Sequence, residues 1–195
     1  MANFISTIFS KKETKDNTKL VLQAQLCVQN AILDKHLIAL AVHKGRLEDL
    51  DSLLSLTTSI GELKIAVHEE LNLISQYIEC YKTLKGQEFY IKLQHNIEVS
   101  NDFEIYPFIL VTLVQNAIIH GYTTMEKYPI RIKINEIGKT LKIEVSNRVN
   151  HYIANQEDTE LINNFKARLA LLYPDSHSLI INSNSNLFKA TLLLN

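Results

Sequence analysis

The first half of the chain repeats its apolar positions with the period of a helix. From Leu20 to about Gly45, apolar side chains return at steps of three, four or seven residues, which places them on one helical face. The same spacing predicts helices over about 47–58 and 63–85. Because the connections at Gly45 and at residues 59–61 are short, we expect successive helices to pack as antiparallel hairpins.

After Gly86 the apolar positions alternate instead, which is typical of strands. Residues 130–135 and 141–145 alternate strictly, and Gly138 between them indicates a hairpin. The other predicted elements are strands at 89–94, 178–183 and 187–194 and helices at 107–121 and 161–173. Helices segregated to one face of a mostly antiparallel sheet form an α+β sandwich, so we predict this fold class.

This change of pattern divides the chain into three segments. Residues 1–18 form a charged lead-in that is flexible or a short helix. Residues 19–86 form a helical segment, and residues 87–195 form an α/β sandwich with a mixed, mostly antiparallel sheet.

Composition excludes several classes of protein. The apolar fraction of 46% and the charged fraction of 21% are those of an ordinary soluble globular protein. A net charge of -1 argues against a nucleic-acid partner, and no apolar run is long enough to predict a membrane span. Cys27 and Cys80 form no metal or redox motif, so we expect free thiols and a cytoplasmic location.

Two polar residues interrupt the apolar helix predicted at 107–121. Asn116 and His120 are four residues apart, so they lie on the same helical face. Burying polar groups without partners is costly. A metal-bound phosphate group would satisfy both side chains, and bonds to local backbone carbonyls are the alternative.

The segment from Pro107 to Gly121 resembles the N-box of GHKL ATPases. The match is to the form found in LytS/YehU-type sensor histidine kinases, which reads Pro-x-x-Leu-x-x-Leu-Val-Glu-Asn-Ala-x-x-His-Gly. The resemblance implies that Asn116 ligates Mg²⁺ bound to ATP and that His120 lies at the nucleotide. Gln115 stands where the family has a glutamate, and a carboxamide cannot take up a proton near neutral pH.

Weaker matches to the same family occur in the same order at residues 22–25, 69–78 and 168–173. They imply a GHKL-type domain over 87–195 behind a dimerisation segment. In such a homodimer the helices within 19–86 would form a four-helix bundle. The leucine stripe of these helices is too apolar to leave in water, although it could also be buried within one subunit.

The phosphoacceptor of the family is missing from its expected position. The family motif opens with Pro-His-Phe-Leu-Phe-Asn, and its histidine falls on Gln29, which cannot accept a phosphoryl group. His36 and His43 are seven residues apart on one helical face. They are alternative acceptors, or they are simply solvated helix residues.

The adenine and phosphate contacts are also altered. Asn147 replaces the family's aspartate, and its carbonyl can still accept a hydrogen bond from the adenine amino group. The Gly-x-Gly that approaches the phosphates falls on residues 159–161, where Glu160 would repel them.

These losses favour a degenerate relative of LytS-like kinases. Such a protein would be a cytoplasmic dimer that acts in two-component signalling by binding a response regulator or a partner kinase. One alternative is a divergent ATP-dependent histidine kinase that uses His36 or His43, with Asn116 holding Mg²⁺. The other is a histidine phosphotransferase that needs no ATP and relays phosphate through the same histidines.

Overall fold

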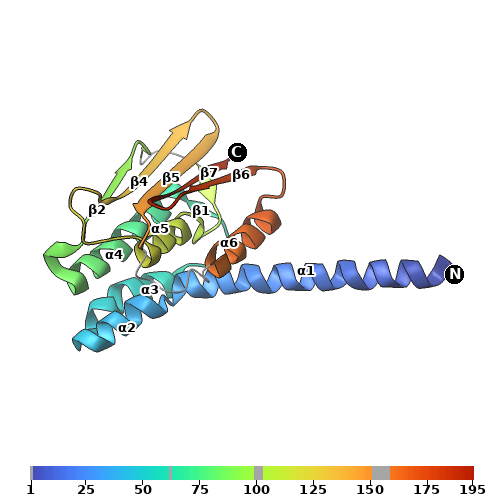
Figure 1. The fold of residues 1–195 in the computed structure, drawn as a ribbon, viewed down its shortest axis with the longest axis horizontal. Coiled ribbons are helices and arrows are strands. Elements are labelled where there is room, and N and C mark those ends of the chain that lie inside the picture. The colour runs from blue at the N-terminus through green and yellow to red at the C-terminus, as the bar shows by residue number, and fades with distance from the viewer. Residues whose placement is uncertain (1, 62, 99–102, 151–158) are drawn as a thin grey trace.

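The computed structural model describes residues 2–61, 63–98, 103–150 and 159–195 (Figure 1). Six α-helices lie in these ranges: α1 (Ala2–Ile32), α2 (Lys35–Lys44), α3 (Asp51–Ser59), α4 (Val67–Lys85), α5 (Ile109–His120) and α6 (Thr159–Leu172). Two short 3₁₀ turns, Leu47–Leu50 and Gly86–Glu88, precede α3 and follow α4. None of the described helices is long and apolar enough to cross a membrane.

Five strands form one sheet in the order β2-β4-β5-β7-β6. Its strands are β2 (Ile91–His95), β4 (Ile130–Ile137), β5 (Thr140–Arg148), β6 (His177–Ser183) and β7 (Leu187–Leu194). β2 runs parallel to β4, and the other neighbours are antiparallel. The two-residue strands β1 (Ile65–Ala66) and β3 (Glu104–Ile105) pair separately. The mixed, mostly antiparallel sheet behind N-terminal helices confirms the predicted α+β class.

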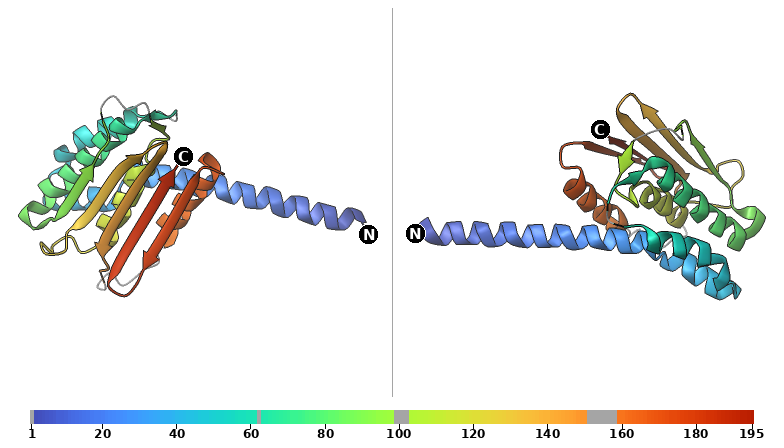
Figure 2. Two further views of the ribbon diagram at one scale, coloured as in Figure 1. Left: turned by 90° about the horizontal axis from the view of Figure 1, so that it is seen from above. Right: turned by 180° about the vertical axis from the view of Figure 1, so that it is seen from behind.

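The helices cover one face of the sheet and leave the other face open (Figures 1 and 2). Alternating residues of β4, namely Ile130, Ile132 and Ile134, are fully buried against the helices. α5 lies deepest, because every residue from Ile109 to Ile118 is buried. The helix that resembles the N-box is therefore the centre of the core.

The single helix predicted from Leu20 to Gly45 is wrong, because the structure breaks it into α1 and α2. Asp34 caps α2: its carboxylate accepts hydrogen bonds from the backbone amides of His36 (2.8 Å) and Leu37 (3.2 Å). A capping aspartate satisfies amides that begin a helix, so it favours a new start at this point. The turn after α2 falls at Gly45, as predicted, with φ of +65°.

α1 runs past residue 18, where the lead-in segment was expected to end, and its N-terminal part leaves the body of the molecule (Figure 1). The apolar stripe of the predicted helix divides between two environments. Leu37 and Ala41 of α2 are buried within the chain, and α2 packs against α4. On α1, by contrast, Val21, Leu22 and Leu26 are 43%, 55% and 47% exposed.

Candidate functional site

The backbone changes direction sharply where α5 begins. Pro107 was predicted as the first helical residue, but α5 begins at Ile109. The reason is Phe108, which adopts φ of +61°, a left-handed conformation that few residues other than glycine adopt. Such a conformation persists only where surrounding contacts hold it.

A buried carboxylate on α4 supplies these contacts. Glu70 accepts hydrogen bonds from the amides of Phe108 (2.8 Å), Leu110 (3.0 Å) and Val111 (3.1 Å). It therefore satisfies amides that the first turn of a helix leaves free. Burial raises the pKa of Glu70 to about 7, although the same amides and Arg168 act in the opposite direction.

α6 and the residue that follows it hold the chain just before Phe108. Arg168 donates a hydrogen bond to the carbonyl of Pro107, and the Tyr173 hydroxyl accepts one from the amide of Tyr106 (2.9 Å). Glu70, Arg168 and Tyr173 lie in segments that the sequence matched only weakly to the kinase family. Their convergence on the start of α5 gives these matches a structural role that sequence analysis did not assign.

The other end of α5 meets the corner between α1 and α2. Gln115 donates a hydrogen bond from Nε2 to the carbonyl of Asn30 (2.7 Å) at the end of α1. Its Oε1 is buried and has no hydrogen-bond partner among the described residues. The side chain at the family's glutamate position thus holds two helices together.

A polar cavity of about 120 Å³ lies beside Gln115. Pockets that bind cofactors measure about 300–1,000 Å³, so the part of this cavity that the described residues enclose is smaller than such a pocket. Its polar lining comes from three elements that the sequence separates widely: Asn30, Asp34, Lys35 and His36 at the α1–α2 corner, Gln115 and His120 on α5, and Glu160 on α6.

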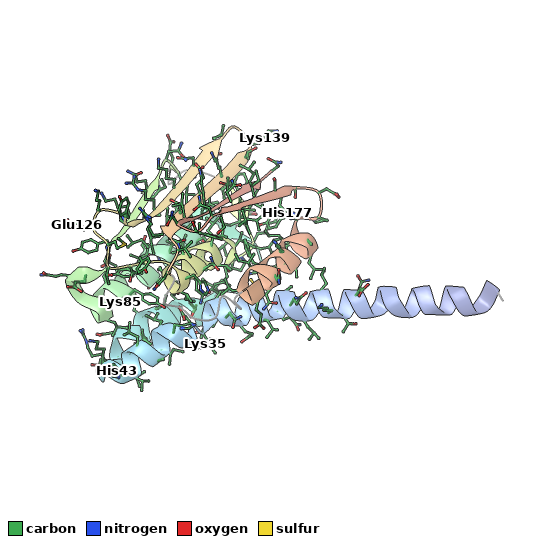
Figure 3. All side chains as sticks on the ribbon, in the orientation of Figure 1. Lys35, His43, Lys85, Glu126, Lys139 and His177 are labelled. Carbon is green, nitrogen blue, oxygen red and sulfur yellow. The ribbon has the colours of Figure 1, made fainter. Side chains whose placement is uncertain are left out.

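The structure separates the two candidate phosphoacceptors. His36 lines the cavity together with Gln115 and His120. His43 is exposed near the other end of α2, whereas Lys35 lies at its start (Figure 3). Gln29, at the family's acceptor position, is exposed on α1 and does not line this cavity.

Asn147 is 3% exposed on β5 and lies against Gly121. Its Nδ2 donates to the carbonyl of Arg148 (3.1 Å), and its Oδ1 has no hydrogen-bond partner among the described residues. A Cβ on Gly121 would lie 2.9 Å from Asn147 Nδ2 and 2.4 Å from the carbonyl of Ala117. This close contact requires glycine at position 121.

These residues do not fit magnesium and ATP in the arrangement described. Asn116 is 4% exposed, whereas Mg²⁺ keeps several waters and needs open space around its ligands. The cavity lining holds two carboxylates, Asp34 and Glu160, and one ammonium group, Lys35, so it offers phosphate no excess of positive charge. Within the described ranges, no three histidine, cysteine or acidic side chains are grouped so that they could hold a metal ion.

No family model and no curated protein matches the chain. Among solved structures, the chain is similar to the catalytic domain of the histidine kinase ThkA, at 12% identity and a TM-score of 0.46 over 69% of this chain and 95% of that one. It is similar to the Acinetobacter baumannii histidine kinase AdeS, at 14% identity and 0.45 over 90% and 94%. It is also similar to a bacterial phosphotransferase, at 10% identity and 0.42 over 90% and 96%.

Proposed function

We propose that the chain is a two-component signalling protein, related to the cytoplasmic part of LytS-like histidine kinases, that no longer transfers phosphate. It would act by binding a response regulator or a partner kinase. One observation carries this proposal: the α1–α2 corner packs on the face of α5 that the family uses for nucleotide, with Gln115 bonded to Asn30.

The chemistry that phosphoryl transfer requires supports the proposal. Transfer depends on a metal–phosphate group positioned beside its acceptor. Asn116 is buried, Gln115 cannot act as a base, and Glu160 brings negative charge to the phosphate end. Each change weakens a different requirement, so no single substitution would restore the site.

A second function is favoured by the position of His36. His36 lines the cavity together with Gln115 and His120, so this candidate acceptor lies beside α5. A slow histidine kinase, or a phosphotransferase that takes phosphate from a regulator's aspartate, would use this juxtaposition. His43 has no comparable surroundings.

The homodimer that we propose would form through α1. α2 and α3 pack against α4 within the chain, so they are not free to build a four-helix bundle. Val21, Leu22 and Leu26 remain exposed beside Leu171 of α6. Sedimentation velocity of the wild type and of a Leu22→Lys/Leu26→Lys variant tests this interface: a dimer that the substitutions convert to monomer supports it, and a wild-type monomer contradicts it.

Labelling with radioactive phosphate tests the loss of transfer. The protein is incubated with γ-³²P-ATP and Mg²⁺, and separately with a phosphorylated receiver domain, beside His36→Ala and His43→Ala variants. We expect no acid-labile label on any of them. Label that His36→Ala abolishes and His43→Ala retains would replace our proposal with the second function.

A further inference from the structure

The open face of the sheet has no helix over it (Figure 2, left view). Successive side chains of a strand point to opposite faces, and residues in register on neighbouring strands point to the same one. The buried isoleucines of β4 point toward the helices. Residues such as Arg131 and Lys133, which alternate with them and are exposed, therefore lie on the open face.

This open face is strongly basic. We define the basic face by the cations that strand register places on it: Lys92 of β2, Arg131 and Lys133 of β4, Lys142 and Arg148 of β5, and Lys189 of β7. The strands, all within the described residues, contribute one carboxylate to it, Glu144. Because the whole chain has a net charge of -1, the opposite charge is concentrated elsewhere.

Glu144 shows how this face binds a carboxylate. Its two oxygens lie 2.7 Å from Lys189 Nζ on the neighbouring β7 and 3.1 Å from Lys142 Nζ on its own strand β5, so two lysines hold one acid. These two lysines lower the pKa of the Glu144 carboxyl. The geometry of a carboxylate held between neighbouring strands is thus already present on the sheet.

Among the described residues, Lys92 and Arg131 on the β2–β4 side have no acid opposite them, whereas Lys133 lies opposite Glu144 in the β4–β5 register. Lys92 lies directly opposite Arg131 in the parallel register, and Lys133 follows two residues later. In the described part of the chain, no ion pair joins any of these three to an acidic residue. Like charges opposite each other on neighbouring strands destabilise a sheet, and an incoming carboxylate would relieve this repulsion.

We propose that the basic face docks an acidic segment of a partner protein, whose carboxylates lie between Lys92, Arg131 and Lys133 as Glu144 lies between Lys142 and Lys189. Charge complementarity carries the inference, since opposite potentials steer and orient association. It goes beyond the signalling role proposed above and holds whether or not the chain binds nucleotide.

Other anionic partners fit this surface less well. Single-stranded nucleic acids bind through stacking of bases on aromatic rings, and no outward side chain of the five strands is aromatic. The ring of Tyr128, just before β4, already packs against one cation of this face, Arg148, at 4.2 Å. An interfacial membrane protein inserts a band of apolar side chains. The register also puts three exposed apolar side chains on the open face, Ile137 of β4, Ile180 of β6 and Leu187 of β7, but they lie in three separate rows and form no band. Gln94, Ser146 and Thr191 lie among the cations and offer the hydrogen bonds typical of a protein interface.

Fluorescence anisotropy with a labelled peptide of alternating glutamate and threonine tests the proposal. The face variant is Lys92→Glu/Arg131→Glu/Lys133→Glu. Its matched control, Lys19→Glu/Lys44→Glu/Lys166→Glu, changes the charge equally at exposed positions on the helices. We expect the peptide to bind the wild type and the control alike, and the face variant about tenfold more weakly.

Two further measurements make the test specific. Single-stranded DNA of equal charge and phosphatidylglycerol vesicles are titrated in parallel. Tighter binding of either than of the peptide, equal weakening by both variants, or no peptide binding to the wild type would overturn the proposal. We also expect Arg131→Gln to raise the melting temperature, because it removes the repulsion with Lys92, and to weaken peptide binding. Weaker peptide binding without a higher melting temperature would contradict the role of that repulsion.

Discussion

The buried polar groups at the two ends of α5 differ in whether they have hydrogen-bond partners. At the start, Glu70 accepts bonds from the free amides of the first turn, and Arg168 and Tyr173 fix the residues before it. At the other end, Gln115 Oε1 and, on the adjoining strand, Asn147 Oδ1 are buried without hydrogen-bond partners among the described residues. Buried polar groups are usually satisfied, so the second end is the exceptional one.

The two ends therefore differ in what their buried polar groups contact. The relation to LytS-like kinases that we propose implies metal and phosphate at the second end, where its polar residues would be satisfied. In this chain those residues remain, but they face a small cavity and the backbone of α1. Under the function that we propose, these unpartnered oxygens mark a ligand site that has become a packing site.

Removing the anchor of the first end should have the largest effect. Glu70→Ala leaves three buried amides without their acceptor and opens a void, so we expect it to lower the free energy of unfolding by about 3–5 kcal/mol. Tyr173→Phe removes one neutral acceptor and should cost about 1 kcal/mol. Urea unfolding measures both, and equal losses would contradict the importance given to Glu70.

The same carboxyl should make stability depend on pH. The folded pKa of Glu70, about 7, lies above its ordinary value of 4.5, so the folded state binds its proton more tightly. The contribution of Glu70 to the free energy of unfolding is therefore complete below pH 4.5. About 3 kcal/mol of it is lost as the pH rises toward 7. Chemical unfolding of the wild type and of Glu70→Gln at several pH values measures the difference, and parallel profiles would show that Glu70 does not titrate in this way.

Crowding at the second end should be measurable as well. Gly121→Ala places a Cβ against Ala117 and Asn147, so we expect it to destabilise the fold by about 1–3 kcal/mol. Gly61→Ala is the matched control, because nothing lies within 4 Å of its added Cβ. If thermal unfolding finds the two variants alike, α5 and β5 are not in the close contact described.

The smallest effect is expected for the substitution of Gln115 by methionine. Gln115→Met removes the bond to Asn30 and the orphaned Oε1 together, so stability should stay within about 1 kcal/mol of the wild type. Gln115→Glu keeps the shape but turns an acceptor toward the Asn30 carbonyl, and we expect it to cost about 1–2 kcal/mol. A stabilising Gln115→Glu would mean that this position still favours the family's carboxylate.

The sequence predicted what depends on local pattern. Strict alternation and Gly138, whose φ is +64°, located the β4–β5 hairpin correctly. The break at Asp34 was missed because the apolar period continues across it. An aspartate at this point is nevertheless a typical N-cap residue, and its side chain caps the amides of His36 and Leu37. The weak matches that contain Glu70 and Arg168 identified important residues without indicating what they bond.

Other features could not be read because they depend on which strands become neighbours. The parallel pairing of β2 with β4 joins segments separated by α5, and it alone puts Lys92 beside Arg131. A net charge of -1 concealed the basic face that results. Likewise, the placement of His36 at the N-box depends on the α1–α2 corner folding back over α5.

Titration calorimetry with ATP, in the presence and absence of Mg²⁺, tests most directly whether the second end of α5 is closed to nucleotide. Asn116→Ala is the control, because Asn116 is the metal ligand that the kinase resemblance implies. Our account predicts no saturable heat for either protein at millimolar ATP. Saturable binding that requires Mg²⁺ and disappears in Asn116→Ala would contradict it.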